Sequence, residues 1–164
     1  MAKNVKRGKM KVPAEVYFLR YAFPCSHIIC KIRKEISDEE YKKMERAAAE
    51  GKVLGREYLE KVFFRAFERI EKIAKEMKKD KWDKEVIEEY FVRRHNFFVD
   101  ASDNPESFKE LCRIHRANVS DVKGKELIVE YENGKKRTVK NNYVPNVKVG
   151  DKVMIHYFYA VEKV

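Results

Sequence analysis

The sequence predicts an α+β fold, in which a helical N-terminal domain precedes a small C-terminal β-barrel of the OB-like or SH3-like kind. Before residue 96, apolar residues recur every three or four positions, which is the period of amphipathic helices. From Leu111 onward the period changes to two, and turn sequences separate four or five short segments rich in β-branched and aromatic residues. We therefore expect a basic disordered arm over residues 1–11, a helical domain over 12–104 and a barrel over 105–164.

The expected helices are recognised by their apolar period and by their end signals. Ser37 followed by Glu40 forms a capping box at the start of one helix, and Gly51 supplies its end. The longest apolar stripe runs from Leu59 to Met77 and predicts one long helix. The expected helices cover residues 14–23, 25–35, 38–50, 56–79 and 83–93.

The expected strands are bounded by turn sequences, of which Asn133-Gly134 is the strongest. This pair supplies the positive φ values of a type I′ hairpin turn. In the last strand, His156 alternates onto the same face as Met154 and Phe158, so it lies among apolar neighbours. The expected strands cover residues 114–122, 126–131, 136–142 and 152–159.

The composition indicates a cellular setting. Charged residues make up 39% of the chain and Gln is absent, a bias that resembles thermophile proteins. Three cysteines occur without a secretory signal, and no apolar run reaches the roughly 18 residues of a membrane span. We expect a cytoplasmic protein without membrane association, whose cysteines are free, metal-bound or catalytic.

The net charge of +10 is concentrated near the two ends of the sequence. Residues 112–164 carry 11 Lys or Arg against 6 Asp or Glu, and residues 1–11 are basic without any acid. This distribution suits a polyanion or an acidic protein as partner, although a solvated surface gives the same pattern. The residues expected to contact RNA or another single strand are Lys6, Arg7, Lys9, Arg93, Arg94, Lys135, Lys136, Arg137, Tyr157 and Tyr159.

A possible zinc motif lies near the N-terminus, where Cys25, His27 and Cys30 offer three ligands within one short segment. On a helix, Cys25 and Cys30 would point apart by roughly 140°, which opposes binding of one ion. The alternative is that both cysteines are small buried hydrophobic residues. The residues that would have to complete the metal shell are His95, Cys112 or His115.

Three segments of the C-terminal part carry a family resemblance. They are Leu111-Cys-Arg-Ile-His-Arg-Ala-Asn-Val119, Tyr131-Glu-Asn-Gly-Lys-Lys-Arg-Thr-Val139 and the segment from Tyr143 to Val164, which contains Val-Gly-Asp-Lys-Val-Met-Ile-His and ends in Ala-Val-Glu-Lys-Val. They resemble the HypC/HupF family of nickel–iron hydrogenase maturation chaperones. The resemblance implies an OB-like barrel that binds a partner scaffold protein and carries an iron–cyanide–carbonyl fragment on a cysteine and a histidine. Cys112 and His156 fall at the matching positions, although the family's cysteine follows the initiator methionine and Cys112 is internal.

Cys112 and His156 are also a chemically suitable pair for iron or zinc, because a thiolate and a neutral imidazole are soft and borderline ligands. Arg113 and Arg116 add cations that favour the thiolate form of Cys112. Ordinary packing of a cysteine and a histidine inside a barrel is the alternative.

Three functions remain open at this point. No Gly-rich phosphate loop, nucleophile elbow or paired-carboxylate motif occurs, so we expect a protein that is not an enzyme. The first function is a HypC-like accessory protein that docks on a protein partner and holds a metal fragment. The second is nucleic-acid binding, and the third is an interaction module without a ligand site.

Overall fold

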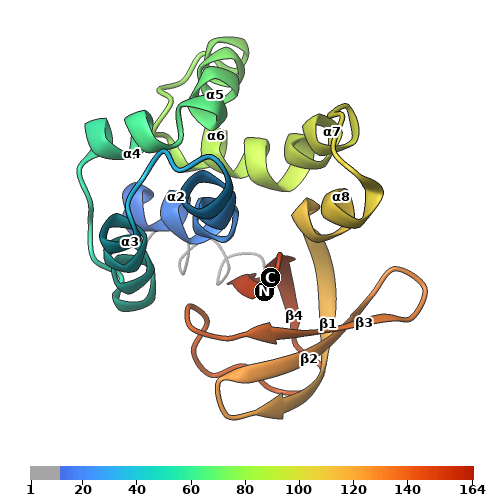
Figure 1. The fold of residues 1–164 in the computed structure, drawn as a ribbon. Helices are drawn as coiled ribbons and strands as arrows, with labels where there is room; N and C mark the ends of the chain where they lie inside the picture. Colours follow the sequence, from blue (N-terminus) through green and yellow to red (C-terminus); the bar gives the residue numbers. More distant parts are fainter. Residues whose placement is uncertain (1–11) are drawn as a thin grey trace. The chain divides into compact units, whose positions relative to one another are not determined.

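The computed structural model describes residues 12–164, and the chain divides into two compact units, Met1–Arg94 and His95–Val164 (Figure 1). The first unit is helical, and the second contains a closed five-stranded β-barrel. The predicted α+β class, with a helical part followed by a small barrel, is confirmed. The second unit begins at His95, so two short helices that precede the barrel belong to it. The predicted N-terminal arm, with Lys6, Arg7 and Lys9, lies outside the described residues.

The helical unit contains five α-helices within its described residues, together with 3-10 and π segments. These elements are α2 (Ala14–Ala22), η1 (Phe23–Cys25), η2 (Ile28–Ile32), α3 (Asp38–Glu50), α4 (Arg56–Val62), α5 (Phe64–Met77), α6 (Lys84–Glu88) and η3 (Glu89–Arg94). The capping box of α3 is present in both directions: the Glu40 N–H donates to Ser37 Oγ and the Ser37 N–H donates to Glu40 Oε2. Gly51 ends α3 at a φ of 72°.

The long helix predicted over residues 56–79 is wrong, because the helix breaks at Phe63 into α4 and α5. Phe63 leaves the helical region, with φ −103° and ψ 40°. Its buried ring packs edge-on against Phe18 at a centroid distance of 5.4 Å. The apolar stripe therefore gave the helical period but could not place a break that depends on tertiary packing.

An aromatic cluster around Phe18 forms the core of the helical unit. The Phe18 ring, which is fully buried, contacts Phe63, Phe67, Trp82 and Phe91 at centroid distances between 4.7 and 5.7 Å. These rings come from α2, the break at Phe63, α5, the turn before α6 and η3, so they hold the unit together by apolar burial.

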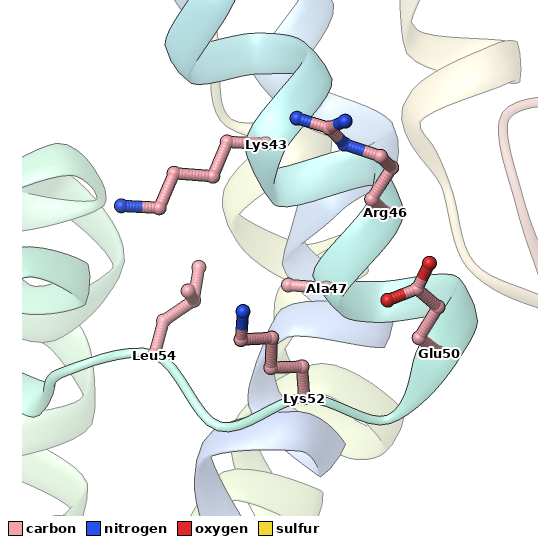
Figure 2. A pocket seen from close by; sticks show the side chains of 6 residues that line it. All are labelled: Lys43, Arg46, Ala47, Glu50, Lys52 and Leu54. Carbon is pink, nitrogen blue, oxygen red and sulfur yellow. The ribbon is translucent and has the colours of Figure 1, made fainter.

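A cavity of about 290 Å³ lies beside the C-terminal half of α3 in the helical unit (Figure 2). Ala47 and Leu54 are its buried apolar lining, and the charged side chains of Lys43, Arg46, Glu50 and Lys52 make up the rest, as Figure 2 shows. Binding cavities for small molecules present convergent polar groups on an apolar lining. Most of the lining of this hollow is charged, and none of the predicted site residues lines it.

The C-terminal unit begins with two short helices, α7 (His95–Asp100) and α8 (Glu106–Cys112). The barrel follows with β1 (His115–Lys123), β2 (Glu126–Tyr131), β3 (Lys135–Lys140), β4 (Lys152–His156) and β5 (Tyr159–Lys163). The single strand predicted over residues 152–159 is wrong, since it is divided at Tyr157 and Phe158 by a tight turn. Tyr157 has a φ of 52°, which no β-strand residue adopts.

The barrel closes in the strand order β1-β2-β3-β5-β4, with β1 pairing with both β2 and β4. All ladders are antiparallel except β3 with β5, which pair in parallel at Lys140 and Tyr159. Closure leaves no free sheet edge. The interior is filled by fully or almost fully buried aliphatic side chains, namely Leu127, Val129, Val139, Val153 and Ile155.

The predicted hairpin at Asn133-Gly134 is confirmed as the connection between β2 and β3. Glu132, Asn133 and Gly134 all have positive φ, so the loop has three residues between Tyr131 and Lys135, and the expected two-residue type I′ turn is wrong. None of the helices formed by residues 12–164 combines the length and the apolar character needed to cross a membrane.

Candidate metal centre

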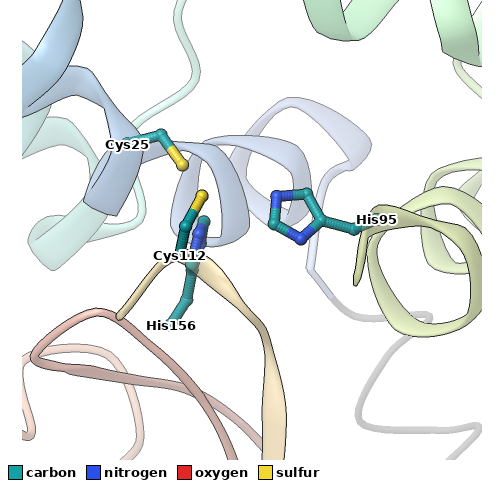
Figure 3. Close-up of side chains that lie close together, drawn as sticks. All are labelled: Cys25, His95, Cys112 and His156. Atoms are coloured by element: carbon teal, nitrogen blue, oxygen red, sulfur yellow. The ribbon is translucent and has the colours of Figure 1, made fainter. Parts of the chain in front are cut away.

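Three potential metal ligands come together within the C-terminal unit: His95, Cys112 and His156 (Figure 3). Each offers one ligand atom, and these atoms lie within 4.8 Å of one another. All three residues are buried, with exposed fractions of 5%, 8% and 0%. Cys25, which Figure 3 also labels, belongs to the helical unit, where it is the last residue of η1.

The spacing of the three ligand atoms is close to that of an occupied metal site. Ligands about 2.0 to 2.3 Å from a tetrahedral ion are about 3.3 to 3.8 Å from one another. The rings of His95 and His156 lie 5.0 Å apart at an angle of 76°, so they do not stack and can converge on one point. The group can therefore hold a metal ion after a small contraction.

Every ligand stands at the end of a secondary-structure element. His95 is the first residue of α7, Cys112 is the last of α8, and His156 is the last of β4. The antiparallel pairing of β1 with β4 sets His115 opposite Ile155, which brings the end of β4 back to the start of β1. The Tyr157 N–H donates to the Leu111 carbonyl at 3.0 Å, and this bond joins the neighbours of His156 and Cys112.

Asn96 connects the segment of His95 with the segment that follows Cys112. Its Nδ2 donates to the Ile114 carbonyl at 2.8 Å, and its Oδ1 accepts from the Ile114 N–H at 2.7 Å. This two-bond contact fixes the first turn of α7 against the segment that directly follows Cys112. His95 Nδ1 itself lies 3.4 Å from Asn96 Oδ1.

The chemistry of the ligands restricts the metal. A thiolate and two imidazoles suit zinc, iron and other transition metals, whereas magnesium and calcium prefer oxygen ligands. The structure thus brings together Cys112 and His156, and it adds His95. The sequence indicated His95 only as an added ligand for the cysteine motif near the N-terminus. No local pattern connects His95 with Cys112, because their approach depends on the Asn96 contact.

The structure separates the other members of the N-terminal motif from any ligand group. His27 is exposed, and Cys30 is buried in η2 with its Sγ 3.4 Å from Asp38 Oδ1. Burial, reinforced by the hydrogen bond to Asp38, raises the pKa of the Cys30 thiol and favours its neutral form. Within residues 12–164, no group of three Cys, His or carboxylate ligands includes His27 or Cys30.

The two basic residues nearest to Cys112 in the sequence, Arg113 and His115, lie beside acids. Arg113 forms ion pairs with Asp100, Glu106 and Glu110. His115 is buried, and its Nδ1 lies 3.0 Å from a carboxylate oxygen of Glu132. Burial lowers the pKa of His115, which favours its neutral form.

Several residues predicted for nucleic-acid contact are paired or buried. Arg93 and Arg94 both pair with Glu89, and Arg94 also pairs with Glu76. Lys135 pairs with Glu132.

The same holds on the barrel. Lys136 stands opposite Glu130 in the ladder of β2 and β3, so two charges of opposite sign face each other across these strands. Arg137 is buried among hydrogen-bond partners. Tyr159 is buried against Tyr143, with the rings stacked at 5.7 Å. Of the predicted residues that the structure describes, Arg137 and Tyr159 are thus buried, and Arg93, Arg94 and Lys135 are paired with acids.

Comparison of the chain with protein-family models, with curated proteins and with solved structures finds no match.

Proposed function

We propose that the C-terminal unit binds one transition-metal ion through His95, Cys112 and His156, and that the chain is a non-enzymatic accessory protein that carries this ion for a protein partner. The observation that carries the proposal is the convergence of three ligand atoms within 4.8 Å from the ends of three separate elements.

The ligand set favours zinc or ferrous iron. Both accept imidazole and thiolate, and the buried surroundings suit a low-coordination site more than an octahedral, hydrated one. The three ligands of the C-terminal unit leave the fourth position of a tetrahedral ion to a ligand from outside that unit. In zinc proteins, a closed set of four ligands is typical of structural sites, and an open position is typical of sites that exchange a ligand. An accessory protein that passes on a metal needs such an exchangeable position.

The resemblance of the C-terminal segments to the HypC/HupF family supports the same proposal. It indicates a small barrel in which a cysteine and a histidine hold an iron fragment, and Cys112 and His156 are at the matching positions. The closed five-stranded barrel and the proximity of these two residues agree with that expectation. His95 would be an additional ligand of this chain.

Metal titration under anaerobic conditions tests the proposal. Wild type and the variants His95→Ala, Cys112→Ala and His156→Ala are titrated with zinc, ferrous iron and cobalt(II), the last because thiolate ligation gives it a charge-transfer absorption. We expect one ion per chain in the wild type and a loss of binding in each variant. Where a variant still binds cobalt weakly, the complex should keep the thiolate absorption in His95→Ala and His156→Ala and lose it in Cys112→Ala.

Two control variants match the chemistry of the substitutions. His27→Ala removes an exposed histidine, and Cys30→Ala removes a buried cysteine that bonds to Asp38. Both should bind like the wild type. Cys25→Ala is included because the sequence also predicts Cys25 as a possible metal ligand. Absence of binding in the wild type, or unchanged binding in Cys112→Ala and His156→Ala, would refute the proposal. Salt-dependent binding of single-stranded RNA would then be measured.

A further inference from the structure

We infer that Arg137 and Asn96 are positioning residues of the metal centre, which hold the segments next to all three ligands in place before an ion binds. The inference rests on the proposed function. It follows from hydrogen bonds that connect the immediate neighbours of His95, Cys112 and His156 to one another.

Arg137 connects the segment of Cys112 with the segment of His156. It lies on β3, and only 8% of its surface is exposed. Its Nη1 donates to the Tyr157 carbonyl at 2.8 Å, and its Nη2 donates to the Glu110 carbonyl at 3.3 Å. Tyr157 directly follows His156, and Glu110 lies two residues before Cys112, the last residue of α8. One guanidinium therefore joins the two ligand-bearing segments.

The Tyr157 turn shows why such a connection is needed. Tyr157 and Phe158 form a two-residue turn between β4 and β5, and the first residue has a φ of 52°. Glycine is the residue that normally takes a positive φ at this position of a tight hairpin, and a bulky aromatic residue is strained there. Both backbone groups of Tyr157 are bound: its N–H donates to Leu111, and its carbonyl accepts from Arg137. These two bonds fix the strained turn and thereby the end of β4 that carries His156.

Arginine suits this position better than lysine would. Its planar fork donates at the same time to the two carbonyls and to the Tyr131 hydroxyl, the last at 2.8 Å. Its guanidinium also lies 4.9 Å from the centre of the Tyr131 ring. A lysine ammonium is a single point of charge and cannot span both carbonyls in this way. A buried arginine with all these contacts is explained by a structural task next to the site.

Asn96 holds the segment of His95 in place, as Arg137 holds the segment of His156. Its side-chain amide exchanges two hydrogen bonds with the backbone of Ile114, which directly precedes β1 and lies just beyond Cys112. Both connections therefore end on the chain that flanks Cys112. The three ligand segments form one frame through protein contacts alone, so the ion meets ligands that are already assembled.

Metal affinity in variants of the frame tests the inference. Arg137→Lys and Asn96→Ala leave all three ligands in place, and Ser120→Ala is the matched control. Ser120 also donates a side-chain hydrogen bond to a backbone carbonyl of the same unit, that of Ile128 at 3.1 Å. Zinc and cobalt(II) affinities and the cobalt absorption spectrum are measured at a temperature where circular dichroism shows each variant to be folded.

We expect Arg137→Lys and Asn96→Ala each to bind one ion with an affinity about 10- to 100-fold weaker, as is usual when a residue that orients metal ligands is changed. The cobalt spectrum at saturation should differ from that of the wild type, a change that mere loss of stability would not produce. Ser120→Ala should match the wild type. If Arg137→Lys does not fold, Asn96→Ala decides alone.

Two results would overturn the inference, and they are distinguishable. If the wild type binds metal but both frame variants bind with its affinity and spectrum, the positioning role is wrong and the proposed function stands. If the wild type binds no metal, the proposed function fails and the positioning role falls with it.

Discussion

Among the described residues, the helical unit buries one polar side chain, Ser26, whereas the C-terminal unit buries His95, His115, Arg137 and His156. Burial of a polar or charged group costs free energy unless hydrogen bonds or a bound ion compensate for it. The helical unit fills its core with aromatic rings and buries fewer polar groups, among them the Trp82 indole N–H, which has no hydrogen-bond partner. The C-terminal unit accepts this cost in the part of the molecule where the candidate ligands meet. The difference is in keeping with the metal site that we propose for the C-terminal unit.

Several charged residues of the helical unit form ion pairs near its surface. Arg56 pairs with Glu15, Arg93 with Glu89, and Lys81 with Glu60. Exposed pairs of this kind contribute little stability individually. In the C-terminal unit the guanidinium of Arg137 is inside, where each of its hydrogen bonds has no competing solvent. Arginine thus forms ion pairs at the surface of the helical unit, whereas Arg137 lies in the interior of the C-terminal unit.

The largest expected effect tests the apolar side of this comparison. Phe18→Ala removes the ring at the centre of the aromatic cluster and leaves a cavity among four other rings. We expect the free energy of unfolding of the helical unit to fall by about 3 to 5 kcal/mol, as measured by urea denaturation.

Phe64→Ala is the matched control for this substitution. Phe64 also lies in the helical unit, but 41% of it is exposed. Its removal should change the free energy of unfolding by no more than about 0.5 kcal/mol. Equal effects of the two substitutions would show that the aromatic cluster does not dominate the stability of this unit.

The second prediction concerns a buried polar group that is not a proposed ligand. His115 lies against the Tyr131 ring at 4.7 Å, with Glu132, Glu110 and Arg137 as its charged neighbours. Burial lowers the pKa of His115 in the folded chain, so the unfolded chain binds the proton more readily. Stability should therefore be complete above the unfolded pKa of about 6.5 and should fall as the pH drops below it.

His115→Phe measures this contribution by difference. Urea denaturation of metal-free wild type and variant is compared between pH 8 and pH 5, in roughly half-unit steps. The wild type should lose more stability than the variant below about pH 6.5, because only the wild type must keep His115 neutral. Any contribution from His95 and His156 is common to both proteins and cancels in the difference. A steeper loss in the variant would contradict the assigned direction.

Local signals predicted the parts of the structure that local chemistry determines. Ser37 with Glu40 gave the start of α3, and Asn133-Gly134 gave the hairpin between β2 and β3. The change of the apolar period from helical to alternating predicted that the helical part precedes the β-barrel. Each of these features depends on residues that are close in sequence, so a single sequence contains the information.

The failures share the opposite cause. The break at Phe63 depends on packing against Phe18, and the turn at Tyr157 depends on bonds to Leu111 and Arg137. Tyrosine followed by phenylalanine gives no turn signal, so the alternation of apolar residues predicted an unbroken strand there. The approach of His95 to Cys112 was not predictable either, because the contact that makes it joins the distant segments of Asn96 and Ile114.

The smallest expected effect compares two arginines of the two units directly. Arg93 is more than half exposed and pairs with Glu89 one helical turn earlier at 3.0 Å. Arg93→Met should lower the free energy of unfolding by no more than about 0.5 kcal/mol, because such exposed pairs are weak. Arg137→Met leaves two backbone carbonyls and the Tyr131 hydroxyl without their donor, and should cost about 1 to 3 kcal/mol. Urea denaturation of both variants, with Glu89→Gln to close a double-mutant cycle for the exposed pair, measures the contrast. Equal losses would mean that burial does not distinguish the two guanidinium groups, and the reason for assigning the chemistry to the C-terminal unit would then rest on the ligand geometry alone.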